Sequence, residues 1–230
     1  MVRTVILLSS FMVLLATGAA AETQTLNFTD FDEVSVGYGM RAAIHQSDAY
    51  RLEATGALED LERLEVKKNG SRLEFSLKSG WGRWFGGGRI TLDITLPRLR
   101  RLALSGGSIG SLDMQMGSSP FSAALSGGSS LDGRLGCGNA DLALSGGSQA
   151  GLSGTGQHLS LSGSGGSQYQ LRNFAAGDVN VNLSGGSEAT VTLRGELSAA
   201  LSGGSEVAYY GNAALRSVHA SGGSRVRKGT

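Results

Sequence analysis

The chain has 230 residues, with 20 Lys and Arg against 19 Asp and Glu, so its formal net charge at pH 7 is +1. A balance this even argues against nucleic acid or an anionic membrane surface as the main partner, because both select for a basic face. The single cysteine, Cys137, excludes an intrachain disulfide framework.

Residues 1–21 have the composition of a secretory signal peptide. Arg3 is their only charged residue, an apolar run covers Val5–Leu15, and Ala19–Ala21 supplies small residues for cleavage before Glu22. The apolar run is too short for a membrane-spanning helix, which needs about 20 residues. We therefore expect an exported protein, periplasmic or at the cell surface, with no transmembrane segment in the mature chain.

Residues 22–104 alternate apolar and polar side chains in several short runs, which is typical of β-strands. Asn69-Gly70 separates two of these runs and is the strongest short signal for a β-hairpin. We expect this region to supply the first coils of a larger stack and to cap its end, which would otherwise be an open sheet edge.

Both tryptophans of the chain lie in one short segment that also contains Arg83 and Phe85, namely Trp81-Gly-Arg83-Trp84-Phe85. The segment separates two predicted strands, so we expect it to form a loop. Trp beside Arg on a loop suits contact with a glycan, a membrane interface or a protein partner. The alternative is an aromatic plug folded over the end of the stack.

Residues 105–230 carry seven copies of the tetrapeptide SGGS, spaced 18 to 21 residues apart. The copies start at Ser105, Ser126, Ser145, Ser164, Ser184, Ser202 and Ser221. The region holds 27 of the 37 glycines and only 14 charged residues, a composition that would also fit a disordered linker. Disorder gives no reason for the apolar residues to keep phase with the tetrapeptide, and here they do.

Apolar residues two apart precede each SGGS, as in Leu102 and Leu104 or Leu142 and Leu144. This period predicts one short strand before each turn, with one side facing inward. Because one repeat cannot bury its apolar residues alone, we expect the repeats to stack as a parallel β-solenoid with about 19–20 residues per coil. The fourth repeat, LSGSGGS, is interpreted as two residues longer than the others. Residues 22–230 would then form one continuous domain.

Each SGGS is interpreted as a corner of the solenoid, because glycine tolerates the positive φ of a tight bend and lets coils approach closely. Its serine hydroxyls would bond either the turn backbone or one another. The predicted structural glycines are Gly106, Gly107, Gly127, Gly128, Gly146, Gly147, Gly165, Gly166, Gly185, Gly186, Gly203, Gly204, Gly222 and Gly223.

The chain resembles the bacterial family called putative auto-transporter adhesin, head GIN domain. The resemblance rests on Phe31–Val36, Ala43–Gln46, Asn69–Leu73 and Leu96–Leu99, together with the recurrent Leu-Ser-Gly units. It covers essentially all of the mature chain. It implies a right-handed parallel β-helix that is exported and has an adhesin-like role.

The chain offers no strong catalytic or metal-binding motif. The G-x-S-x-G match at Gly106–Gly110 is a by-product of the repeated corner, since a nucleophile elbow needs a strand-to-helix turn. His45, His158 and His219 lack metal-ligand spacing. We therefore expect no catalytic residue, no metal and no cofactor.

One carboxylate pair is weighed as a possible catalytic site. The residues directly after the corners should form an outward column: Ile109, Ser130, Gln149, Gln168, Glu188, Glu206 and Arg225. In this register Glu188 and Glu206 lie about one strand spacing apart, a separation that a retaining glycosidase uses. The alternative is a solvated ladder in which Arg225 neutralises Glu206.

The sequence thus favours a non-catalytic, exported β-helix protein that acts in adhesion or in interactions at the cell envelope. Its expected partner is an unknown protein or glycan, and not nucleic acid. The alternatives are a polysaccharide-active β-helix enzyme and a purely structural envelope scaffold.

Overall fold

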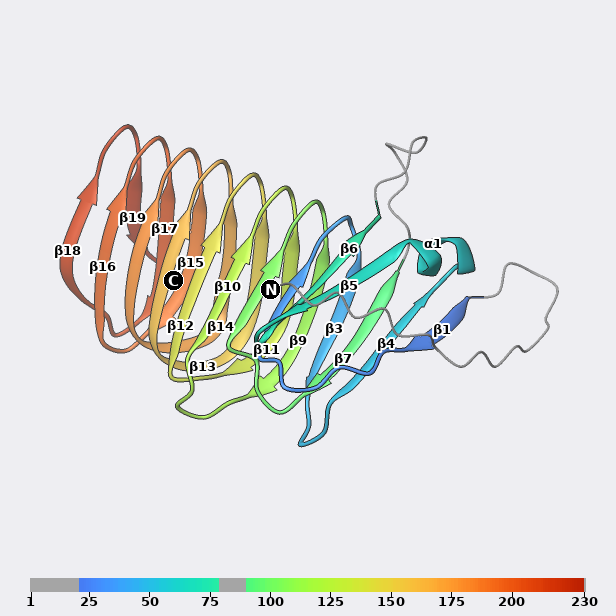
Figure 1. Ribbon diagram of the computed structural model, residues 1–230. Coiled ribbons are helices and arrows are strands. Elements are labelled where there is room, and N and C mark those ends of the chain that lie inside the picture. The colour runs from blue at the N-terminus through green and yellow to red at the C-terminus, as the bar shows by residue number, and fades with distance from the viewer. Residues whose placement is uncertain (1–20, 79–89, 230) are drawn as a thin grey trace.

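A computed structural model describes residues 21–78 and 90–229. Within these ranges the strands form one 19-stranded sheet, and the only helix is the six-residue α1 (Leu58–Arg63). The strands stack as the coils of a parallel β-helix, or β-solenoid (Figure 1). The predicted all-β solenoid fold is confirmed.

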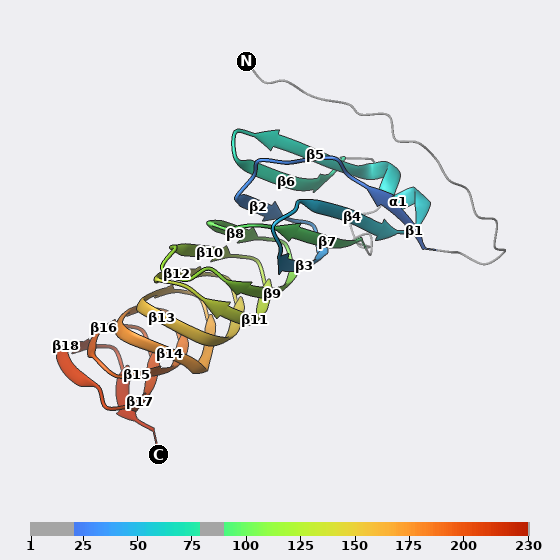
Figure 2. The same ribbon diagram turned by 90° about the horizontal axis from the view of Figure 1, so that it is seen from below.

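The coils present two faces, here called the first and the second face (Figure 2). The first face contains β2 (Glu33–Val36), β8 (Arg101–Leu104), β10 (Phe121–Leu125), β12 (Asn139–Leu144), β16 (Glu196–Leu201) and β18 (Ala214–Ala220). The second face contains β3 (Arg41–Gln46), β7 (Thr91–Leu96), β9 (Ile109–Gln115), β11 (Ser130–Gly136), β15 (Glu188–Leu193), β17 (Glu206–Gly211) and β19 (Arg225–Lys228). Two longer strands, β13 (Gln149–Gly163) and β14 (Gln168–Leu183), run from the second face to the first.

The alternation of apolar and polar residues places the apolar side chains inside the solenoid. In β12, Leu142 and Leu144 are buried whereas Ala143 between them is exposed. Leu142 pairs in register with Ala123 on one side and with Leu161 on the other, so equivalent side chains stack from coil to coil. Burial of one such leucine is worth about 1.5–3 kcal/mol, and the stacked residues form a single apolar core.

All fourteen predicted corner glycines have a positive φ, between 61° and 78°. The first glycine of each corner also packs closely, because an added Cβ would lie 3.0–3.4 Å from a backbone nitrogen of the preceding coil. An added Cβ at the second glycine would meet nothing within 4 Å. The corner therefore needs glycine twice, for backbone conformation at both positions and for space at the first.

The last serine of the corner faces inward and is buried in six of the seven copies. Its hydroxyl donates a hydrogen bond to the carbonyl oxygen of the first serine, as from Ser148 Oγ to Ser145 O at 2.7 Å. Equivalent bonds of 2.7–2.9 Å occur in the other five. Of the two expected arrangements, these hydroxyls adopt the bond to the turn backbone, which satisfies a buried polar group.

The N-terminal region combines coil strands with antiparallel strands. The predicted hairpin is formed by β5 (Leu64–Asn69) and β6 (Arg72–Leu77), with Gly70 at φ 61° in its two-residue turn. β4 (Arg51–Gly56) pairs antiparallel with β7 and with β1 (Glu22–Thr25). The hairpin, β1, β4 and α1 lie at the end of the solenoid opposite to β18 (Figure 1).

The interpretation of the fourth repeat as two residues longer is wrong. Gly163 pairs in register with Leu144 on one neighbouring coil and with Leu183 on the other. The repeat therefore has the common length and carries glycine where its neighbours carry leucine. A count of leucine positions alone cannot distinguish such a substitution from an insertion.

Candidate functional site

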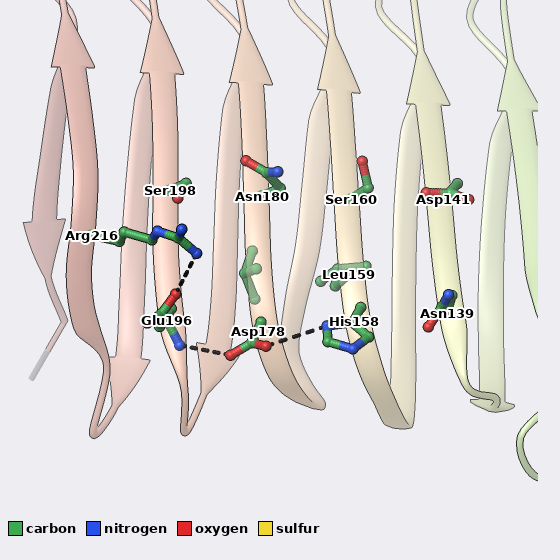
Figure 3. Close-up of a pocket in the computed structure, with 11 residues that line it drawn as sticks. Asn139, Asp141, His158, Leu159, Ser160, Asp178, Asn180, Glu196, Ser198 and Arg216 are labelled. Atoms are coloured by element: carbon green, nitrogen blue, oxygen red, sulfur yellow. Dashed lines mark hydrogen bonds and ion pairs between the residues drawn. The ribbon is translucent and has the colours of Figure 1, made fainter.

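A shallow polar groove of about 260 Å³ lies on the first face, across β12, the ends of β13 and β14, β16 and β18. Two rows of outward side chains line it, and each row continues from coil to coil (Figure 3). The first row is Asn139, His158, Asp178 and Glu196, and the second is Asp141, Ser160, Asn180 and Ser198. We call these eight residues, together with Arg216, the polar groove.

The period of the strands explains why these residues face outward. In β13, Leu159 and Leu161 are buried in the core, so His158 and Ser160 point to the opposite side. Val179 and Val181 place Asp178 and Asn180 outward in β14 by the same alternation. Because the coils keep register here, residues that are distant in sequence form continuous rows.

Polar contacts connect four successive coils along the groove. Asp178 Oδ2 lies 3.3 Å from His158 Nδ1, and Asp178 Oδ1 accepts a 2.9 Å hydrogen bond from the backbone nitrogen of Glu196. Glu196 Oε2 in turn accepts a 3.0 Å hydrogen bond from Arg216 Nη1 (Figure 3). These contacts hold the carboxylates in fixed positions while much of each side chain remains exposed to solvent.

The groove presents amide, hydroxyl, carboxylate and guanidinium groups to the solvent. Together they offer both donors and acceptors of hydrogen bonds, and equivalent groups on successive coils repeat at about 4.8 Å. This arrangement suits a polar ligand that extends along the solenoid axis. In the part of the chain that the structure describes, no group of three His, Cys, Asp or Glu is placed to hold a metal ion.

The structure brings Glu188 and Glu206 together as register partners on the second face. The whole predicted column is in register, from Ile109 to Arg225. Arg225 Nε donates a 2.8 Å hydrogen bond to Glu206 Oε2, and Arg227 forms an ion pair with Glu206 Oε1. These arginines hold the pKa of Glu206 below its ordinary value. Such a carboxyl stays ionised and is a poor general acid.

The predicted aromatic contact segment, with Trp81, Arg83, Trp84 and Phe85, lies outside the described residues. Within the described residues, no helix has both the length and the apolarity to cross a membrane.

Comparison with protein families identifies a relationship over most of the chain. A family model described as putative auto-transporter adhesin, head GIN domain, matches residues 30–213. The chain belongs to this GIN-domain family. The resemblance noted from the sequence motifs is thereby confirmed. No match is found among curated proteins.

Solved structures share the GIN-domain fold at low sequence identity. A structure described as a putative adhesin from Bacteroides fragilis has a TM-score of 0.84 and 19% identity, covering 92% of this chain and 98% of that one. A structure described as a putative adhesin from Parabacteroides merdae has a TM-score of 0.72 and 14% identity, covering 91% of this chain and 96% of that one. A structure described as a putative lipid binding protein from Parabacteroides distasonis has a TM-score of 0.70 and 17% identity, covering 91% of this chain and 97% of that one. At such identities these likenesses show the fold alone.

The sequence-based reasoning missed the polar groove. Short polar residues at outward positions of a Gly- and Ser-rich repeat resemble an ordinary solvated surface. Aligning the repeats on their SGGS corners would have placed Asp141, Ser160, Asn180 and Ser198 in one row. That row of polar residues was the sequence signal from which the groove could have been predicted.

Proposed function

We propose that this protein is an exported, non-catalytic binding protein that acts in adhesion or at the cell envelope, and that the polar groove is its contact surface. The observation that carries this proposal is the pair of aligned polar rows across successive coils. Core packing and backbone pairing hold the solenoid together, so the fold does not require amide and carboxylate groups at these outward positions.

Membership of the adhesin family supports the same function. Export is supported by the signal-peptide composition of residues 1–21. The partner is proposed to be a glycan or protein of the envelope, because hydrogen-bonding groups on an open surface can follow a long polar molecule without enclosing it. The location is periplasmic or at the cell surface.

The direct test is a binding screen of residues 22–230 against envelope glycans and envelope proteins. The bound ligand is recovered afterwards and its length is compared with that of the starting material. Recovery of intact ligand from a saturable complex supports the proposal. Shortened glycan chains would instead support the alternative of a polysaccharide-active enzyme. In that case Glu188→Gln and Glu206→Gln would be the variants to assay for lost cleavage.

The aromatic segment remains a second proposed contact. Trp81 and Trp84 are the only tryptophans, so tryptophan fluorescence reports on this segment alone. Emission like that of free indole, quenched by iodide, would support a solvent-accessible contact that includes Arg83 and Phe85. Blue-shifted emission that resists quenching would support the alternative of an aromatic plug and remove this contact from the proposal.

A further inference from the structure

Four arginines gather around two adjacent carboxylates near the N-terminal end of the first face. One arginine belongs to β6, one to β8, and two lie in the segment before β8. One carboxylate is at the first residue of β2, and the other is at the residue directly before it. We call this group the arginine cluster: Arg72, Arg98, Arg100 and Arg101 around Asp32 and Glu33.

Glu33 is the centre of the cluster. The parallel register places it between Arg72 on one neighbouring strand and Arg101 on the other. Its Oε2 lies 3.3 Å from Arg72 Nε and 3.4 Å from Arg101 Nη1, while its Oε1 accepts a 2.6 Å hydrogen bond from Arg100 Nη2. The side chain of Glu33 is only 10% exposed, so the guanidinium groups lie over it.

Asp32 holds the other side of the cluster. Its Oδ2 lies 3.4 Å from both Arg98 Nη2 and Arg100 Nε. Its Oδ1 is buried and has no hydrogen-bond partner among the described residues. Arg100 therefore bridges the two carboxylates, and the cluster is one connected unit.

The cluster has more positive charge than its own ion pairs require. Four guanidinium groups face two carboxylates, which leaves a net charge of 4 − 2 = +2. A guanidinium has five N–H donors, and the contacts with Asp32 and Glu33 use one or two from each arginine. The four side chains are 47–58% exposed, so the remaining donors can reach a ligand from solvent.

A network that only fastened β2, β6 and β8 together would gain nothing from two surplus cations, because their repulsion opposes folding. The carboxylates beneath the arginines, whose side chains are 10% and 21% exposed, have a different effect, because they hold the guanidinium groups in place before a ligand binds. Fixed guanidinium groups bind oxyanions such as phosphate or sulfate through paired, charge-assisted hydrogen bonds.

We propose that the arginine cluster binds a phosphate or sulfate ester group, carried by a polysaccharide or by a lipid headgroup. This goes beyond contact through the polar groove, since groove binding requires no anion and either site can fail without the other. The near-neutral charge of the whole chain is compatible with the proposal, because the site needs only a local surplus of two charges.

The test compares wild type with the double variant Arg98→Gln/Arg101→Gln. In this variant Arg72 and Arg100 still contact Glu33, and Arg100 still contacts Asp32. Each carboxylate therefore keeps at least one arginine partner. The matched control is Arg51→Gln/Lys67→Gln, which also removes two positive charges but from exposed one-to-one ion pairs with Glu53 and Glu65, outside the polar groove. Arg98→Gln alone is the fallback if the double variant melts early, because Arg98 contacts only Asp32.

The probes are dextran sulfate, phosphatidylcholine vesicles containing phosphatidic acid, and inorganic phosphate and sulfate as competitors. We expect wild type to bind one or both carriers, with binding weakened by the free anions and by added salt. The double variant should bind about ten-fold or more weakly, since charge-assisted hydrogen bonds are lost, while the control stays within about two-fold. Binding to dextran sulfate alone identifies a polysaccharide source, and binding to vesicles alone identifies a lipid headgroup.

Three results would overturn the proposal. The first is that wild type binds neither carrier nor millimolar free anion. The second is that the double variant binds as tightly as wild type. The third is that the control loses as much affinity as the double variant, which would assign binding to overall charge instead of to the arginine cluster.

Discussion

The ring of Tyr169 occupies the space that a side chain at Gly163 would need. A Cβ added at residue 163 would lie 2.9 Å from Tyr169 Cε2 and 2.7 Å from Leu183 Cδ2. The phenol hydroxyl donates a 2.5 Å hydrogen bond to Ser162 O and accepts a 3.1 Å bond from the backbone nitrogen of Leu144. Burial raises the pKa of the Tyr169 phenol well above its ordinary value.

In this coil the smaller residue is at position 163 and the larger one at position 169, which is the reverse of the neighbouring coils. The coils on either side carry a leucine and, six residues later, an alanine: Leu144 with Ala150, and Leu183 with Ala189. We expect Gly163→Leu alone to overpack the core and destabilise by about 1–3 kcal/mol. Tyr169→Ala alone should leave a cavity and destabilise by about 3–5 kcal/mol.

The double variant Gly163→Leu/Tyr169→Ala restores the pattern of the neighbouring coils, so its destabilisation should be smaller than that of Tyr169→Ala alone. Urea unfolding of the four proteins measures the coupling between the two sites. Simple additivity of the two losses would show that the side chains do not share one space.

The two glycines of a corner should differ in their tolerance of alanine. Gly185 and Gly186 both have positive φ, at 64° and 73°, which is strained by about 1–2 kcal/mol for an alanine. Only at Gly185 would the new Cβ approach backbone of the preceding coil, at 3.2 Å from the nitrogen of Gly165. Gly185→Ala should therefore lower the melting temperature more than Gly186→Ala, and equal shifts would contradict this account of the corner.

Cys137 should behave as a buried core residue. Burial raises the pKa of its thiol from 9.0 to about 11. At pH 8 we expect iodoacetamide to modify the folded protein far more slowly than the urea-unfolded chain, because the thiolate is the nucleophile. The thiol's pKa is higher in the folded state, so its contribution to stability is present below about pH 9 and is lost as the pH rises towards 11. Equal modification rates in the folded and unfolded states would be inconsistent with this burial.

The pKa of Glu206 should lie below its ordinary value, because Arg225 and Arg227 form hydrogen bonds with its carboxylate. Its pKa is lowered in the folded state, so its stabilising contribution is present above the ordinary pKa of a glutamate and is lost as the pH falls through the lowered value. Arg225→Gln/Arg227→Gln should return the carboxyl pKa towards its ordinary value, as measured by carbon-detected NMR titration. The control Arg216→Gln should leave it unchanged, and an unchanged pKa in the double variant would refute the assigned cause.

The parts of the fold that depend on local chemistry could be predicted from the sequence. Positive φ at the corners and the hairpin after Asn69 follow from glycine spacing, and the column from Ile109 to Arg225 follows from the repeat. Compensation between Gly163 and Tyr169 could not be predicted, because it depends on which side chains meet in the core.

The candidate sites were harder to predict from the sequence for a related reason. Arg98, Arg100 and Arg101 are conspicuous in the sequence, but Asp32 and Glu33 lie about 66–68 residues away from them. Only the parallel pairing of β2 with β8 brings these groups together. The polar groove likewise depends on register across coils and not on any local motif.

The central claim, that the polar groove is the contact surface, is tested most directly by one pair of variants. Asn180→Arg places a long cation in the groove on β14, whereas Thr190→Arg makes an equivalent outward change on β15 of the second face. Biolayer interferometry against the panel of envelope glycans and proteins should show binding by wild type and Thr190→Arg, and a loss of about ten-fold or more for Asn180→Arg. Equal binding by both variants, or loss by Thr190→Arg alone, would contradict the proposed contact surface.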